Sequence, residues 1–391
     1  MAGSDTLPAK LFRWIRVLQN AIINGVRVMK KRKWIKWAVL AGIPALFTAL
    51  YFIFSQSKSL ADTAVKCFSR PVRDVLGAVS SIIPFSVMEA AYVAAGVWIL
   101  IHIGRTIYLA LRKRLGIKRL LSRAGAVLLV IAYIFSGYLS LWGIDYRSSS
   151  FSDKENFRVS GVEKEALFEA AEYFTRKAME LADTVKRDEN GLFSEDIGEY
   201  LSAFGTLYDE MEARFPSLKA TSRRPKQMIF SELMSITGFT GVYFPFTGES
   251  NVNVNEPAAF LPATAAHELA HQRGVYSEEE ANFIGVTASV LSDIPAYRYS
   301  GYLTGSLYLM NAVYRASPEK WRELRSRFEG GFLADWQYNS EYWQRYESKV
   351  SAASEKVYDT YLKANGQEAG IQSYGACVNH LVAYYELGGY E

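Results

Sequence analysis

The sequence predicts a mainly α protein. Three transmembrane helices are followed by a water-exposed α+β domain with a short sheet and a long C-terminal helical part. Three observations predict this fold: long apolar runs near the N-terminus, helical spacing of apolar residues in most of the rest, and one stretch rich in β-branched residues and glycine breaks. The chain has 391 residues and is 50% hydrophobic, enough for two or three folded units. We divide it into residues 1–36, 37–146 and 147–391.

The charge is divided unevenly along the chain. Residues 1–145 contain 20 Lys/Arg and 5 Asp/Glu, and the remainder contains 24 and 35. A basic part interleaved with apolar runs indicates a membrane rather than nucleic acid, for which the sequence holds no motif. Cys67 and Cys377 form no C-x-x-C pair and no disulfide framework. Two inert thiols are the preferred interpretation, with a single bridge as the alternative.

Three apolar runs are candidates for membrane spans, because about 18 residues cross a hydrocarbon core of about 30 Å. They cover residues 37–54, 86–111 and 124–144. The first run has a basic lead too long for a signal peptide and no convincing A-x-A-like site after it, so we expect an uncleaved span. Glu89, His102 and Arg105 lie in the second run. We interpret them as end-of-span or core-facing residues rather than functional ones.

Loop charges predict the orientation of the spans. Basic clusters precede the first span, at residues 27–36, and join the second to the third, at residues 112–123. The positive-inside rule places both in the cytoplasm. A loop at about 55–85 then lies outside, as does everything after Asp145. The sequence therefore predicts a multi-pass cell-membrane protein with a cytoplasmic N-terminus, an extracytoplasmic C-terminal domain and the lipid bilayer as a partner.

The C-terminal domain reads as helices around a short β-rich stretch. Residues 227–255 suit short strands, and the polar–apolar alternation of residues 248–255 suits an edge strand. The segment Ser317-Pro318-Glu319 is a good helix start, with proline at the first position. The expected helices cover residues 162–186, 195–214, 302–315, 340–364 and 373–387.

The strongest motif is His267-Glu268-Leu269-Ala270-His271, an H-E-x-x-H. On a helix beginning near Ala263 or Thr264, residues at i and i+4 lie on one face. Both imidazoles can then bind one Zn²⁺, with Glu268 beside them as a general base. The helix is too short and too polar to span a membrane, so the site belongs to the water-exposed domain.

A catalytic zinc site usually has a third protein ligand. Ser277 stands where a metzincin would have its third histidine, so a carboxylate from Glu278, Glu279 or Glu280 is expected instead. Ser277 and Glu280 fit a capping box, which would occupy Glu280. Glu278 shares a face with small residues that would let it approach the metal helix, so we prefer Glu278, then Glu280, then Glu279. The competing interpretation is a solvated acidic helix start.

Several separated motifs resemble one bacterial family. The stretches HELAHQRG…SEEEANF, VYFPFTGESNVN, YSGYL and YLKANGQEAGIQSYG look like the domain-of-unknown-function family DUF3810. That resemblance implies three spans followed by a zinc-metallopeptidase domain. The pair H-E-x-x-H and E-x-x-A-N is also similar to the gluzincin pattern, which implies a zincin-like fold and Glu278 as ligand. Two features depart from gluzincins: Asn282 replaces their aspartate, and the gap from His271 to Glu278 is shorter.

These observations predict a membrane-anchored zinc metalloendopeptidase. It would hydrolyse peptide bonds of a peptide or protein substrate at the outer face of the cytoplasmic membrane, with Glu268 activating a zinc-bound water. Tyr299 or Tyr302 is the expected oxyanion stabiliser and Arg298 an alternative, each with core packing as the competing role. The alternative function is a catalytically inactive zinc-binding sensor or interaction protein on the same scaffold, against which an intact Glu268 argues. We assign His380 no catalytic role.

Overall fold

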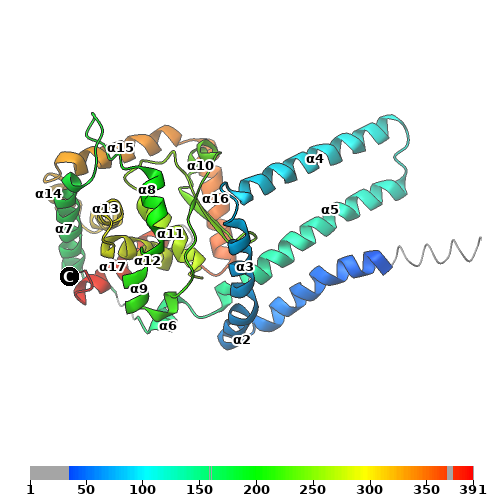
Figure 1. Ribbon diagram of the computed structural model, residues 1–391, viewed down its shortest axis with the longest axis horizontal. Helices are drawn as coiled ribbons and strands as arrows, with labels where there is room; N and C mark the ends of the chain where they lie inside the picture. The colour runs from blue at the N-terminus through cyan, green and yellow to red at the C-terminus, as the bar shows by residue number, and fades with distance from the viewer. Residues whose placement is uncertain (1–34, 158, 160, 368–372, 391) are drawn as a thin grey trace, which may run out of the picture. The chain divides into compact units, whose positions relative to one another are not determined.

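The computed structural model describes residues 35–157, 159, 161–367 and 373–390 and is mainly helical with one small sheet (Figure 1). The predicted cytoplasmic segment 1–36 lies almost wholly outside these residues. The chain forms two compact units. One comprises Met1–Ile53 with Leu109–Ser140, and the other comprises Phe54–Tyr108 with Leu141–Glu391. The second unit therefore contains most of the second apolar helix as well as the C-terminal domain.

Helices long and apolar enough to cross a membrane are found at all three predicted runs. They are Ile35–Phe54, Val87–Leu111 and Ile117–Gly143. The second is α4, and the third consists of α5 (Ile117–Tyr138) and the π-helical turn η2 (Leu139–Gly143). The third begins seven residues earlier than its apolar run, because a helix end tolerates the basic residues that precede the run. The protein is thus membrane-associated, as the sequence predicts.

The connection predicted between the first two spans, at about 55–85, is largely helical. It forms α2 (Lys58–Ala64), η1 (Val65–Ser69) and α3 (Arg70–Ser80). The Ser57 hydroxyl caps α2 by accepting a hydrogen bond from the Leu60 N–H at 3.3 Å. Arg73 of α3 forms a buried ion pair with Asp145, with 2.7 Å between Nη2 and Oδ1. Polar contacts therefore anchor this segment on the C-terminal domain.

A helical core makes up most of the C-terminal domain. Helix α13 packs against α7, and α12 packs against α11, α13 and α17. Fully buried apolar side chains join these helices, among them Phe174, Leu269 and Phe283. The helices are α6 (Phe151–Glu155), α7 (Lys164–Leu181), α8 (Ile197–Ser202), α9 (Asp209–Arg214), α10 (Ser231–Thr237), α11 (Leu261–Gln272), α12 (Glu278–Leu291), α13 (Pro295–Ala316), α14 (Pro318–Arg325), α15 (Gly330–Tyr346), α16 (Lys349–Ala364) and α17 (Ser373–Glu386), with short helical turns η3 (Asp145–Arg147), η4 (Ala182–Thr184), η5 (Ala203–Gly205) and η6 (Pro216–Leu218).

Two of the expected helices are interrupted. The region 195–214 divides into α8, η5 and α9, and the region 340–364 divides into α15 and α16. The second break follows from Ser348, whose side chain and backbone form a capping box with Ser351 and start a new helix. Ser317 caps α14 as predicted, accepting a hydrogen bond from the Lys320 N–H at 3.2 Å.

The sheet has the order β1–β3–β2, with β1 (Lys226–Gln227) parallel and β2 (Gly241–Phe244) antiparallel to β3 (Glu249–Val252). The prediction of an edge strand at 248–255 is therefore wrong, because β3 is central and fully buried. Two of its polar side chains, Ser250 and Glu249, make hydrogen bonds to neighbouring helices. The Ser250 hydroxyl donates to the Glu268 carbonyl at 2.8 Å, and the Glu249 carboxylate accepts the Val87 and Met88 N–H groups of α4. Among the described residues β1 and β2 are the two edge strands, each with one side unpaired by another strand, and β2 is the longer of them.

Candidate metal centre

Helix α11 presents both motif histidines and ends in a turn that orients the second. Gly274 follows the helix at φ +86°, and the Val275 N–H bonds to the Ala270 carbonyl at 3.2 Å. The same turn brings the Val275 carbonyl oxygen within 2.6 Å of His271 Nδ1. A carbonyl partner keeps a proton on Nδ1, which leaves Nε2 of His271 free of a proton and able to bind a metal ion.

A glycine lets α12 pack directly against α11. A Cβ at Gly285 would lie 2.7 Å from the backbone nitrogen of His267 and 2.8 Å from its Cα. Glycine is thus needed for this close approach. The small-residue face that the sequence suggests for α12 therefore does face α11, and Glu278 at the start of α12 lies beside both histidines.

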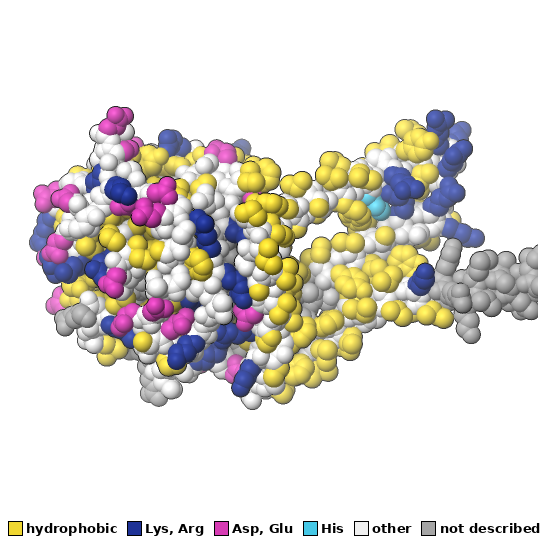
Figure 2. Space-filling model, in the orientation of Figure 1, with side chains coloured by type: hydrophobic (Ala, Val, Ile, Leu, Met, Phe, Trp, Pro, Cys, Tyr) yellow, Lys and Arg dark blue, Asp and Glu magenta, His cyan; other side chains and the backbone are white. Residues whose placement is uncertain are grey.

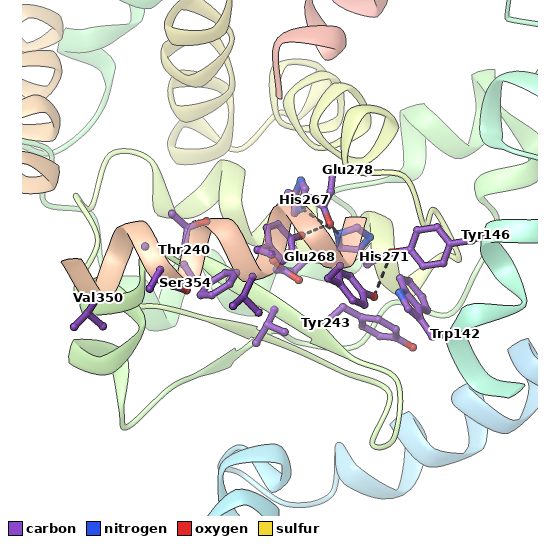
Figure 3. A pocket seen from close by; sticks show the side chains of 18 of the residues that line it. Trp142, Tyr146, Thr240, Tyr243, His267, Glu268, His271, Glu278, Val350 and Ser354 are labelled. Carbon is purple, nitrogen blue, oxygen red and sulfur yellow. Dashed lines mark hydrogen bonds and ion pairs between the residues drawn. The ribbon is translucent and has the colours of Figure 1, made fainter. Parts of the chain in front are cut away.

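The side-chain atoms of His267, His271 and Glu278 converge (Figure 3). The two Nε2 atoms lie 3.1 Å apart, and the Glu278 oxygens lie 3.4 Å from His267 Nε2 and 3.6 Å from His271 Nε2. Zn²⁺ binds nitrogen and oxygen at about 2.0–2.2 Å in a tetrahedron, which separates neighbouring ligands by about 3.3 Å. The three donors therefore fit this metal both in type and in spacing.

The charge state of the cluster also suits a divalent cation. Burial lowers the pKa of His271 to about 4, so its imidazole is neutral at pH 7. Burial opposes ionisation of Glu278, but the nearby His271 and His267 outweigh it and lower its pKa to about 2. The pKa of His267 is shifted upward, in contrast to that of His271. Burial lowers the pKa of His267, but the nearby Glu278 outweighs burial and raises it. A neutral imidazole and an ionised carboxylate are the forms in which these groups bind metals.

Glu268 lies in the same cavity and is held against the sheet. Burial, with the Glu278 charge adding to it, raises the pKa of Glu268 to about 8. A Cβ at Gly241 of β2 would lie 2.8 Å from Glu268 Cγ, so a glycine is needed for this strand to pass. Glu268 Oε2 and His267 Nδ1 are buried, and neither has a hydrogen-bond partner among the described residues. Such orphaned atoms are rare in native proteins outside ligand-binding sites.

The structure separates the three candidate glutamates. Glu279 points away from the cluster, with Oε1 3.2 Å from Nδ1 of His380. His380 also lies 3.1 Å from the Ser152 hydroxyl, through Nε2, and lines a different cavity. It therefore takes no part in the metal cluster.

Glu280 caps the N-terminus of α6, whereas the sequence predicted that it would cap its own helix, α12. Its carboxylate accepts the Phe151 and Ser152 N–H groups, both at 2.9 Å, and so caps α6. The Ser277 side chain makes no capping bond to α12. The predicted capping box between Ser277 and Glu280 is therefore wrong, because the carboxylate is already used by another helix.

The cluster opens into a cavity of about 870 Å³. One wall is the open side of β2, another is α16, and a third comes from the end of the third span and the residues that follow it (Figure 3). The lining residues beyond the cluster include Trp142, Tyr146, Phe239, Val242, Tyr243, Val350, Ala353, Val357, Tyr358 and Tyr361. Most of these side chains are apolar or aromatic, so the cavity suits an apolar segment.

Trp142 connects the cavity to the buried ion pair of α3. The Arg73 guanidinium lies over its indole ring, 4.9 Å from the centroid. The same ring lies 5.8 Å from the His271 ring and 5.1 Å from the Tyr243 ring. The sequence offers no signal for Trp142, Tyr243 or Tyr358, because the three come from segments far apart in the chain.

The structure does not bring the predicted oxyanion stabilisers to the cavity. The Tyr299 hydroxyl donates to Asp335, and Tyr302 packs against Phe174 at 5.2 Å between centroids. Arg298 donates to the Ser292 carbonyl. All three lie on α13, which packs on α7. The tyrosine that contacts the cluster is instead Tyr358 of α16, whose hydroxyl donates to Glu278 Oε1 at 2.7 Å.

The fold and site define a membrane-associated, mainly helical protein with a buried His–His–Glu cluster. A family model described as "Protein of unknown function (DUF3810)" matches residues 65–382, and the chain belongs to this family. This confirms the resemblance seen in the motifs. No curated protein and no solved structure matches the chain.

Proposed function

We propose that the protein is a zinc metallopeptidase whose catalytic domain lies outside the cytoplasmic membrane. The observation that carries the proposal is the convergence of His267, His271 and Glu278 within 4.8 Å of one another in a cavity that also contains Glu268. A structural zinc site has closed coordination, whereas a catalytic one keeps a position open toward a cavity. The basic clusters on the opposite side of the spans support the extracytoplasmic placement.

The three ligand candidates would hold the ion through His267 Nε2, His271 Nε2 and the Glu278 carboxylate. Zn²⁺ would supply Lewis acidity toward a peptide carbonyl and toward water. The Glu268 carboxylate would accept a proton from the attacking water and pass it to the leaving amine. Its raised pKa, about 8 before a cation binds, suits a group that both accepts and returns a proton.

The open side of β2 supports peptide as the substrate class. An extended peptide can add to an exposed strand by backbone hydrogen bonds, and its side chains then enter neighbouring pockets. Strand β2 lies against Glu268 at Gly241, so a peptide bound there would pass beside the general base. The apolar lining of the cavity predicts a preference for apolar residues next to the cleaved bond.

The test is zinc content and cleavage measured on the purified full-length chain in detergent. Wild type should bind one zinc per chain, and His271→Ala and Glu278→Gln should lose it. Glu279→Gln is the matched control and should keep it, because Glu279 pairs with His380 instead. Glu268→Gln should keep zinc and lose cleavage.

Cleavage is measured on a mixed-sequence peptide library by mass spectrometry of new N-termini. Absence of stoichiometric zinc in the wild type would refute the metal centre. If zinc binds but wild type generates no more termini than Glu268→Gln, the protein is not a peptidase, and the inactive zinc-binding alternative is correct.

A further inference from the structure

Helix α3 has its polar face inward and its apolar face outward. Arg73, Gly77 and Ser80 are buried, and Arg73 and Ser80 make hydrogen bonds within the domain. On the other side Val75 and Val79 are 63% and 60% exposed, and Ile82 continues this stripe at 82%. A helix of a water-exposed domain normally shows the reverse arrangement. The exposed stripe therefore calls for an apolar environment.

A second exposed apolar group lies at the start of the membrane helix α4. Ile229, Phe230 and Leu233 are 74%, 44% and 59% exposed. The N–H groups of Ile229 and Phe230 donate to the carboxylate of Glu89 at 3.0 and 2.7 Å. Glu89 thus binds the backbone just before α10 rather than extending to water, and it holds this apolar group next to α4. Figure 2 shows hydrophobic side chains gathered over α3 and beside the start of α4.

The length of α4 indicates how deep in the bilayer the apolar side chains of Ile229, Phe230 and Leu233 lie. Its 25 residues extend about 37 Å, whereas the hydrocarbon core is about 30 Å thick. About two residues at each end then lie in the headgroup layer, which puts Glu89, the third residue, at the boundary with the acyl chains. Tyr92, one turn further along, contacts Phe244 at the end of β2, with 5.6 Å between centroids. The domain therefore meets the bilayer at this level.

We propose that Val75, Val79, Ile82, Ile229, Phe230 and Leu233 form a lipid-binding surface immersed in the outer headgroup layer, and that it holds the cavity at the membrane surface to receive polypeptides anchored in the same membrane. The occupant is lipid because the surface is continuous with a membrane span. The cavity itself reaches that level, since Trp142 in its wall is the next-to-last residue of the span Ile117–Gly143. The substrate class rests on the proposed peptidase function, whereas the lipid-binding surface does not.

The surface is tested with a fluorescent label on single cysteines of the full-length protein in lipid nanodiscs. Cys67 is exposed and is first replaced by serine, and Cys377 is buried. The environment-sensitive dye NBD is placed at Val79→Cys and at Ile229→Cys. Leu387→Cys is the matched control, because Leu387 is an apolar residue with 73% exposure that is outside the proposed surface.

Labels at positions 79 and 229 should lose most of their emission when the lipid carries a nitroxide near the headgroup. The same two labels should lose little emission when iodide is added to the water. The label at 387 should behave in the opposite way. If iodide quenches the labels at 79 and 229 as strongly as the label at 387, and the lipid nitroxide does not, the surface is in water and the proposal is wrong. Protection of 79 and 229 from both quenchers would mean that protein covers them, and this also overturns the proposal.

The substrate class is tested with an unfolded casein segment fused to a single membrane span, reconstituted with the zinc-loaded protein. Cuts should fall within about ten residues of the span, a reach of about 33 Å for an extended chain. Cuts spread evenly along the segment would overturn the membrane-surface assignment of substrate. Absence of any cut, together with no cleavage of the peptide library, would refute the peptidase function, and the label measurements would still decide the lipid-binding surface.

Discussion

Replacement of Gly285 by alanine tests the geometry of the site at the contact between α11 and α12. The new Cβ would lie 2.7 Å from the His267 backbone, and ordinary contacts begin at 3.4 Å, so the helices must separate by about 0.7 Å. This moves His267 away from Glu278, whose oxygen now lies 3.4 Å from its Nε2. Changes beside a metal ligand typically cost about 10–100-fold in metal affinity. We expect a loss of zinc affinity within that range.

Stability is a weaker readout of this change than zinc affinity. Overpacking costs about 1–3 kcal/mol, whereas alanine in place of glycine within a helix contributes about 1 kcal/mol of stabilisation. The two effects partly cancel in the free energy of unfolding, but nothing cancels the displacement of His267. The assay is competition for zinc against a chromophoric chelator, with the purified protein in detergent.

The control for this prediction is Gly205→Ala. Gly205 has no atom within 4 Å of the position that a Cβ would occupy, so its replacement should leave zinc affinity unchanged. If Gly285→Ala binds zinc as tightly as wild type, the close packing of α12 on α11 does not set the ligand geometry, and the reasoning fails.

Three further predictions follow from other contacts. Tyr358→Phe should weaken zinc binding about tenfold, because it removes the 2.7 Å hydrogen bond to Glu278; zinc competition checks this. Arg73→Ala should lower the free energy of unfolding by about 3–5 kcal/mol, because it leaves the carboxylate of Asp145 buried and unpaired; chemical denaturation in detergent measures it. Burial raises the pKa of Glu256 well above its ordinary value of 4.5, so the folded protein holds this proton more tightly than the unfolded chain does. The stability that this proton contributes is fully present below pH 4.5 and declines as pH rises above it; Glu256→Gln should make the decline of melting temperature with pH shallower.

Matched measurements separate these effects from general damage. Tyr361→Phe changes a tyrosine of the same helix and cavity whose hydroxyl lies 3.3 Å from the Tyr146 hydroxyl, and it should keep wild-type zinc affinity. An equal loss in both tyrosine variants would argue against a specific role for Tyr358. An unchanged denaturation midpoint in Arg73→Ala would show that Asp145 is solvated or protonated. A pH profile of Glu256→Gln identical to wild type would contradict the assigned pKa shift.

Local patterns in the sequence determined the spans and the centre of the site. Apolar runs of sufficient length report membrane helices directly, because a spanning helix depends on its own composition. The spacing in His267-Glu268-Leu269-Ala270-His271 likewise predicts one helix face, because i and i+4 neighbours follow from helix geometry alone. The small residues of α12 favoured Glu278, and the structure places that glutamate at the cluster.

Only the tertiary structure decided how distant segments combine. The choice among Glu278, Glu279 and Glu280 depends on partners at His271, His380 and the N-terminus of α6, which no local pattern encodes. Polar residues of β3 looked exposed in the sequence, yet Glu249 and Ser250 bond to α4 and α11, so β3 is the central strand and β1 and β2 are the edges.

The dependence on contacts between distant segments also explains why the sequence predicted the wrong tyrosines for the cavity. A tyrosine on a helix can face the core or the cavity, and its neighbours in sequence do not distinguish the two. Tyr299 faces α15 at Asp335, whereas Tyr358 faces the metal cluster, because α13 packs into the core and α16 lies over the cavity. The sequence by itself determined which residues can bind a metal ion and that the chain enters a membrane. The packing of helices determined which side chains meet at the site, since those contacts join distant segments, such as Tyr358 with Glu278 and Trp142 with His271.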